Sequence, residues 1–364
     1  MMAIDNNNPA KMTPHPSLPL LVLSALTLPT ASSFQAKQHF HPSSYPRRHA
    51  TTTTHPSSSS SALQAQRLTP RQLQFWEDVE SGLVDIEKFY QSKNGQSMER
   101  IRTFCQRAQG ELPPPFPEVS GNQPSEEHVD GLTAKPFWDT ASDTINFPWA
   151  TKLEDNAPII IEEFQQKLLN NTPQGEGGLF SGDSAWQSAI MGQGWSAFRL
   201  QRLGVWNVAN CAVFPKTYDL LRGLDIPLAV RGVCFARQAM GSGVAPHSDG
   251  RNFILTAHLG LKVPDGCWIK VGDEERTWSV GKLTTLDTSF EHSTGNPTNE
   301  DRHVLIIDFW HPELTEAERA GLEFIYDLRN KFESGEIPFR QPRSKAEGEG
   351  LGGLWSALTG GKSI

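Results

Sequence analysis

The sequence predicts a mainly β protein with a sandwich or barrel core of the jelly-roll class, flanked by α-helices. Two observations carry this prediction. Between residues 195 and 310, short apolar runs of strand length follow one another, and turn sequences such as "VPDG" and "GDEE" separate them. Helical periodicity is found before this region and, after it, only in "TEAERAGLEFIYDLRNKFES", residues 315–334.

The composition sets broad limits on function. The chain has 364 residues, of which 37% are hydrophobic, enough for one large domain or two modest ones. Its net charge of -8 implies no basic surface, so we expect no nucleic-acid partner. The four cysteines form no CxxC pair, which argues against a zinc knuckle or a disulfide framework and favours buried free thiols.

The first 68 residues are predicted to be a disordered targeting presequence. Residues 17–28 are apolar but too short to span a membrane, which is typical of a signal-peptide core. Small residues follow, and residues 35–68 are rich in Ser and Thr and contain no acidic residue, as in a transit peptide. This order resembles the bipartite plastid presequences of algae, so we expect a plastid location and no transmembrane segment in the mature chain. The alternatives are the secretory pathway, which glycosylation of the sequon at Asn170 would favour, and unprocessed disorder.

A helical segment is expected over residues 69–110. Thr69 and Pro70 read as an N-cap followed by proline at the first helical position. A second, short helix is expected over residues 98–108. Apolar residues at helical spacing mark one face of the first helix: Leu73, Trp76, Val79, Leu83, Ile86 and Tyr90.

The remaining chain divides into three parts. Residues 111–134 are Pro-rich and are expected to form a linker, residues 135–340 the main domain, and residues 341–364 a flexible Gly-rich tail. Within the main domain a helix is expected over residues 155–169. The final helix has Thr315 as its N-cap and Glu318 at the capping-box position. The expected strands are residues 194–201, 229–237, 252–263, 267–272, 276–280, 282–287 and 303–310.

The segment "APHSDGRNFILTAHLGL", residues 245–261, contains the first candidate metal ligands. Residues i and i+2 of a strand face the same way, so His247 and Asp249 can address one metal ion from an extended segment. His292 follows the predicted strand 282–287 in a turn-like segment and is the candidate third ligand. Two histidines and a carboxylate are the facial ligand set of non-haem Fe(II) oxygenases. The alternative is a polar turn before an ordinary strand.

Two further residues are candidates for binding an anionic small molecule. Arg302 opens the strand "RHVLIIDFW", and alternation places it on one face with Val304 and Ile306. A lone arginine leading an apolar face can clamp a carboxylate inside a barrel. His258 shares an inward face with Thr256 in the earlier strand. The alternatives are a surface ion pair for Arg302 and a hydrogen-bonded core position for His258.

The order of these motifs resembles the aspartyl/asparaginyl β-hydroxylase family of Fe(II)/2-oxoglutarate dioxygenases. Over residues 195–325 the pattern runs P-H, H-L-G-L, T-W-x-x-G-K, D-x-S-F-E-H, R and D-x-W-H-P-E-L-T. The resemblance implies a double-stranded β-helix that uses Fe(II), 2-oxoglutarate and O₂. It also implies iron binding by His247 and His292, co-substrate binding by Arg302, and His258 near the other carboxylate of the co-substrate.

The sequence departs from this family at several positions. Animal members have glycine where Asp249 stands, so this chain has a full facial triad. Those members also place an arginine at the position of Thr256 and a serine near Ala236. Arg237 and Arg251 are candidates to compensate for the missing arginine. Tyr218 stands where the family's partner cysteine for Cys211 would be, so that disulfide is not expected.

The sequence therefore predicts an Fe(II)/2-oxoglutarate-dependent hydroxylase with a small-molecule co-substrate. No catalytic residue is expected beyond the metal ligands. Family members act on peptidyl Asp or Asn and relatives on other substrates, including lipids, so the substrate stays open between peptide, small molecule and lipid. The alternatives are a non-catalytic cupin-like module that binds a metal or small molecule, which Thr256 and Ala236 favour, and metal-assisted hydrolysis at a zinc site.

Overall fold

The computed structural model describes residues 68–117, 119–170, 179–180 and 194–340. These residues belong to one compact unit. The predicted presequence, apart from its last residue, and the predicted tail lie outside the described residues, so both stay predictions. The boundaries predicted between the helical segment, the linker and the main domain also stay predictions.

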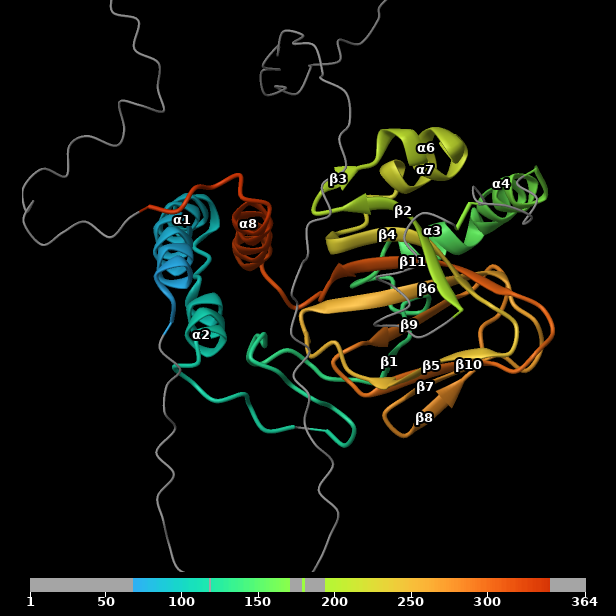
Figure 1. Cartoon of the computed structure of the whole chain (residues 1–364), viewed down its shortest axis with the longest axis horizontal. Coiled ribbons are helices and arrows are strands. Elements are labelled where there is room, and N and C mark those ends of the chain that lie inside the picture. Colours follow the sequence, from blue (N-terminus) through green and yellow to red (C-terminus); the bar gives the residue numbers. More distant parts are fainter. Residues whose placement is uncertain (1–67, 118, 171–178, 181–193, 341–364) are drawn as a thin grey trace, which may run out of the picture. The chain divides into compact units, whose positions relative to one another are not determined.

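Two antiparallel sheets make up the core (Figure 1). The larger has the order β1 (Phe137–Trp138), β9 (Leu283–Asp287), β6 (Ile254–Lys262), β11 (Arg302–Trp310), β4 (Leu228–Gln238), β2 (Trp195–Arg202), β3 (Val205–Trp206). The smaller has the order β5 (Ser242–His247), β10 (His292–Asn296), β7 (Trp268–Val271), β8 (Glu274–Arg276).

Apolar side chains of both sheets meet in one cluster. Ala236, Leu286 and Val304 come from the larger sheet, and Ile269 and Val271 from the smaller one. All five are nearly or fully buried. Two antiparallel sheets that share an interior are the arrangement of a jelly roll, or double-stranded β-helix. The predicted fold class is confirmed.

Helices cover the outer face of the larger sheet: α3 (Ala150–Asp155), α4 (Ala157–Asn170), α6 (Val208–Val213) and α7 (Pro215–Gly223). Phe164 of α4 and Phe214 pack against Phe235 of β4 in this layer. The expectation that helix returns only at residues 315–334 is wrong, because α6 and α7 lie between β3 and β4. Both helices are too short to show helical periodicity, although a side-chain cap from Asn207 opens α6 and Pro215 opens α7.

A second group of helices comprises α1 (Pro70–Asn94), α2 (Glu99–Ala108) and α8 (Glu316–Glu333). Thr69 and Thr315 each form the capping box that caps α1 and α8, as predicted for Thr315. The predicted apolar face of α1 is partly wrong: Leu73 is 49% exposed, and Phe75 is buried against Phe332 instead. No helix among the described residues is long and apolar enough to cross a membrane.

Two strands that position the candidate site were not predicted. The sequence reading placed His292 in a turn, but it is the first residue of β10. No strand was expected between residues 238 and 251, but β5 spans Ser242–His247. β10 is polar and β5 contains Gly243 and Pro246, so neither strand has the apolar alternation that marks a half-buried strand. Conversely, the strand predicted over residues 276–280 is reduced to the end of β8 and a single bridge at Val280.

Candidate metal centre

The pairing of β5 with β10 sets the two candidate histidines side by side. His247 and His292 are direct partners in this antiparallel ladder. Their ring centroids are 4.2 Å apart, with an angle of 51° between the ring planes. The backbone hydrogen bonds of the smaller sheet therefore fix the separation of the two imidazoles.

The protonation of both imidazoles suits metal binding. Nδ1 of His247 donates to the carbonyl of Ala245 and Nδ1 of His292 to the carbonyl of Phe290, each at 2.9 Å. Because a carbonyl oxygen can only accept, each Nδ1 carries a proton, and Nε2 of the neutral ring keeps its lone pair. Burial lowers the pKa of His292 and favours its neutral form. Such hydrogen bonds commonly orient metal-binding histidines.

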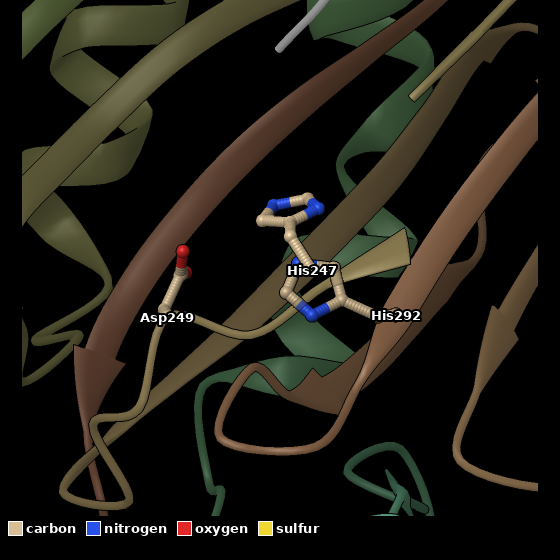
Figure 2. A group of neighbouring side chains, drawn as sticks. All are labelled: His247, Asp249 and His292. Carbon is tan, nitrogen blue, oxygen red and sulfur yellow. The ribbon is translucent and has the colours of Figure 1, made fainter. Parts of the chain in front are cut away.

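Asp249 joins the histidines from the loop that follows β5 (Figure 2). One ligand atom from each of His247, Asp249 and His292 can be chosen so that all lie within 4.8 Å of one another. The strand argument for Asp249 is wrong, because β5 ends at His247. The loop is held instead by the backbone N–H of Asp249, which donates at 2.8 Å to the carbonyl of Thr288, the residue directly after β9.

Arg231 of β4 is a site residue that the sequence analysis missed. Its Nη1 contacts the Asp249 carboxylate, and its Nη2 donates to Asp308 at 3.0 Å and to Thr256 at 2.9 Å. Burial would raise the pKa of Asp249, but the charge of Arg231 outweighs it and holds that pKa well below its usual range. Asp249 therefore stays ionised, as a metal ligand must be.

The local backbone explains why Arg231 reaches this site. Gly232 has φ of 77°, and a Cβ there would lie 2.2 Å from the carbonyl oxygen of Gln201. The ladder between β4 and β11 also loses its register next to this glycine, between the partners of Ile307 and Phe309. Such an irregularity re-aims the neighbouring side chain. An arginine inside an otherwise apolar strand, next to a glycine, was the only sequence signal for this role.

Arg302 is buried inside the barrel and pairs with no acidic side chain of the described residues. It is 1% exposed, and its Nε and Nη1 have no hydrogen-bond partner among the described residues. Its guanidinium carbon lies 4.2 Å from the centroid of the Trp278 ring. Burial lowers the pKa of Arg302 to about 10, so it remains charged at neutral pH. A buried cation with free donors is an unsatisfied group that an anionic ligand would complete.

Trp278 connects Arg302 to His258. Its indole N–H donates to Nδ1 of His258 at 3.2 Å, and the two rings are stacked with an interplanar angle of 19°. Burial, and then the charges of Arg302 and His292, hold the pKa of His258 well below 6.5. His258 is thus neutral and lies within electrostatic reach of both the arginine and a candidate metal ligand. Trp278 was part of the family pattern, but no role had been predicted for it.

The structure shows which side chain lies beside Thr256, where animal members have an arginine. Thr256 donates to Asp308 at 2.6 Å and accepts from Arg231, so an arginine from β4 reaches the place of the missing one. The suggestion that Arg237 or Arg251 compensates is wrong: Arg237 pairs with Asp301 and Arg251 with Glu127. All four cysteines are buried free thiols, so Cys211 forms no disulfide.

Comparison with known proteins confirms the resemblance predicted from the motifs. Residues 154–312 match the family described as Aspartyl/Asparaginyl beta-hydroxylase. The chain is 33% identical over 205 residues to mouse aspartyl/asparaginyl beta-hydroxylase. The aligned region covers 54% of this chain and 26% of the mouse protein. It is 32% identical over 164 residues to human aspartate beta-hydroxylase domain-containing protein 2. Here the aligned region covers 43% of this chain and 40% of the human protein. The chain therefore spans less than half the length of these relatives, which are named as hydroxylases or hydroxylase-domain proteins.

Two solved structures show a weak likeness to the chain. A 2OG-Fe(II) oxygenase family oxidoreductase from Burkholderia pseudomallei has a TM-score of 0.25 and 14% identity, covering 35% of this chain and 73% of its own. A cupin 2 conserved barrel domain protein from Salinispora arenicola has a TM-score of 0.22 and 14% identity, covering 36% and 83%. The fold assignment rests on the strand pairing described above.

Proposed function

We propose, from the match of residues 154–312 to the aspartyl/asparaginyl β-hydroxylase family, that the protein is an Fe(II)- and 2-oxoglutarate-dependent hydroxylase. The observation that carries this proposal is the buried guanidinium of Arg302, whose Nε and Nη1 have no partner among the described residues. It shares the barrel interior with a cluster of two histidines and one carboxylate. The ligand cluster alone would also suit zinc. Hydrolysis at a zinc site does not require a buried arginine with free donors, whereas binding of a carboxylate co-substrate does.

The residues present fit an iron ion. His247, Asp249 and His292 are the two-histidine, one-carboxylate set that Fe(II) oxygenases use, with free Nε2 atoms and an ionised carboxylate. Bound iron would supply the activation of O₂ that couples oxidation of 2-oxoglutarate to hydroxylation of a C–H bond. The two histidines would hold it from one ladder, and Asp249 from the adjoining loop.

The remaining residues would bind and orient the co-substrate. The guanidinium of Arg302, whose Nε and Nη1 have no partner among the described residues, can donate to the carboxylate remote from the iron. His258, held by Trp278, would face the other end of the molecule. The apolar side chains of Val304 and Ile306 would exclude water from the space between them. Arg231 would keep Asp249 ionised and fixed in direction.

Turnover of 2-oxoglutarate by the purified full chain tests this function. With Fe(II), ascorbate and O₂, we expect succinate to be released even without an added substrate, at the slow rate of an uncoupled enzyme. His292→Ala should abolish it, because only one imidazole would remain. Succinate release by His292→Ala at the wild-type rate would refute the assignment. Metal binding with no turnover under any condition would instead favour the cupin-like binding module, and zinc at full occupancy after anaerobic purification would favour hydrolysis.

The substrate remains a prediction. The name of the matching family suggests an aspartyl or asparaginyl side chain of a peptide. Incubation of the enzyme with a peptide library and detection of a mass gain of one oxygen atom would test this class against small molecules and lipids. The predicted plastid location is also untested, and fusion of residues 1–68 to a fluorescent protein would test it.

A further inference from the structure

Residues 121–129 contact the loop that carries Asp249 and the loop that leads into β10 at His292. This stretch, here called the bracing segment, falls within the predicted linker and outside the family match. Next to His292, the N–H of Gln123 donates to the carbonyl of Ser289 at 2.8 Å, and the N–H of Glu291 donates to the carbonyl of Gly121 at 2.9 Å. The side-chain amide of Asn122 also donates to the hydroxyl of Ser289 at 2.9 Å.

The same segment contacts the loop that carries Asp249. The hydroxyl of Ser125 donates to the carbonyl of Gly250 at 2.8 Å. The approach is close, because a Cβ on Gly250 would lie 2.6 Å from that of Ser125. Two residues further, the Asn252 side chain accepts from the N–H of Val129 at 3.0 Å and donates to its carbonyl at 2.8 Å.

Glu127 anchors the bracing segment. It is a largely buried carboxylate whose side chain is 18% exposed. It accepts from Nε of Arg251 at 2.6 Å, next to the Asp249 loop, and from the hydroxyl of Tyr326 at 2.6 Å in α8. Arg329 of α8 is its third partner. One carboxylate thus ties the ligand-bearing loop to the helical part of the chain.

The three candidate ligands differ in how much they need this support. His247 and His292 are fixed by strand pairing. Asp249 follows the last residue of β5, so no ladder holds it. Apart from the contact of its N–H with Thr288 and that of its carboxylate with Arg231, its position depends on the backbone on either side. The bracing segment contacts that stretch on both sides of Asp249: the hydroxyl of Ser248 donates to the carbonyl of Gln123 at 3.5 Å, and the hydroxyl of Ser125 donates to the backbone carbonyl of Gly250.

We propose that the bracing segment is an integral part of the metal centre, with Ser125 and Glu127 as positioning residues for Asp249. The inference rests on the proposed function, because it concerns the same three ligands. It assigns the region before the family match a role in the site in place of that of a spacer. Groups that orient metal ligands change metal affinity by about 10- to 100-fold when removed. We therefore expect Glu127→Gln to weaken metal binding by at least about tenfold.

Titration of the metal-free full chain with Co(II) measures this effect without any turnover. The matched control is Glu87→Gln, which changes another partly buried carboxylate that pairs with an arginine, Arg102, in the N-terminal helices. We expect Glu127→Gln to bind Co(II) at least about tenfold more weakly and to alter the cobalt absorption spectrum, whereas the control stays within about threefold of wild type. Ser125→Ala, which removes one hydrogen bond, should give a smaller loss in the same direction and serves if Glu127→Gln does not fold.

A second background separates positioning of Asp249 from a general loss of stability. In Asp249→Gly, where that ligand is already absent, Glu127→Gln should cause no further loss of Co(II) affinity. In the metal-free chain, hydrogen exchange of residues 248–252 should become faster in Glu127→Gln and stay unchanged in the control. Equal losses with and without Asp249, or a Co(II) affinity no weaker than that of the control, would overturn the inference.

The outcome for the proposed function is distinguishable. If wild type binds Co(II) and His292→Ala does not, while Glu127→Gln and Ser125→Ala both match the control, the ligand set stands and the bracing role fails. If wild type binds no Co(II), or His292→Ala binds it equally well, both proposals fail together.

Discussion

Replacement of Arg302 by methionine tests the interpretation of the barrel interior. Most substitutions of fully buried residues destabilise a protein. Arg302 is 1% exposed, yet its Nε and Nη1 have no partner among the described residues. We therefore expect Arg302→Met to remove 2-oxoglutarate binding without destabilising the unliganded fold. These two effects together distinguish a ligand-binding arginine from a structural one.

The magnitudes follow from the environment of the guanidinium. Burial lowers the pKa of Arg302 from 12.5 to about 10, which corresponds to a cost of about 3 kcal/mol for the charged folded form. Both folded and unfolded chains are protonated at pH 7, so the whole cost applies there. The cation–π contact with Trp278 offsets about 1 to 2 kcal/mol of this cost. Arg302→Met should thus leave the free energy of unfolding unchanged or raise it by about 1 to 2 kcal/mol.

The loss of co-substrate affinity should be much larger. Two hydrogen bonds from a charged donor to a carboxylate contribute about 1.5 to 3 kcal/mol each. Their loss raises the Kd for 2-oxoglutarate by roughly 100-fold or more.

Calorimetric titration of the Co(II)-loaded protein with 2-oxoglutarate measures the affinity, and urea unfolding without ligand measures the stability. Arg237→Met is the control, because Arg237 pairs with Asp301 and faces away from the interior. The control should keep its affinity for 2-oxoglutarate. An Arg302→Met protein that binds 2-oxoglutarate within about threefold of wild type, or that loses several kcal/mol of stability without ligand, would refute the reasoning.

Three further predictions follow from other contacts. Arg231→Met leaves Asp249 without its cation and should weaken Co(II) binding at pH 7 by about tenfold or more, and an unchanged Kd would contradict this. Burial lowers the pKa of His303 to about 4, so the fold is most stable above pH 6.5, where this side chain is neutral in both the folded and the unfolded chain. Up to about 3 kcal/mol of the free energy of unfolding should be lost between pH 6.5 and 4. Urea midpoints that are equally pH-dependent in His303→Phe would contradict this. Glu163→Ala removes the acceptor for two backbone N–H groups at the start of α7 and should cost about 2 to 3 kcal/mol in urea unfolding; a loss below about 0.5 kcal/mol would argue against this capping role.

Strands rich in apolar residues were predictable, because short apolar runs between turn residues are typical of buried strands. In β6 and β11 the alternation of side-chain directions placed His258 and Arg302 inside, and the structure has Val304 in the inner cluster as expected. The capping box at Thr315 was equally readable, since it depends only on local spacing. The family resemblance added the candidate roles of these residues.

The parts that could not be predicted depend on partners remote in sequence. β10 is polar, and only its pairing with β5 and β7 makes His292 part of a strand. Arg231 reaches Asp249 because of a backbone irregularity at Gly232, which spacing does not reveal. The bracing segment looked like a spacer because its contacts are made by backbone groups and single polar side chains, which leave no periodic signal.

The most direct test of the central claim is a crystal structure of the full chain grown without oxygen, with Fe(II) and a non-reactive dicarboxylate analogue of 2-oxoglutarate. Anomalous scattering at the iron edge should place one ion between Nε2 of His247, Nε2 of His292 and an oxygen of Asp249. The remote carboxylate of the analogue should accept hydrogen bonds from the guanidinium of Arg302. An iron ion bound elsewhere, or an analogue that leaves Arg302 without a partner, would contradict the account.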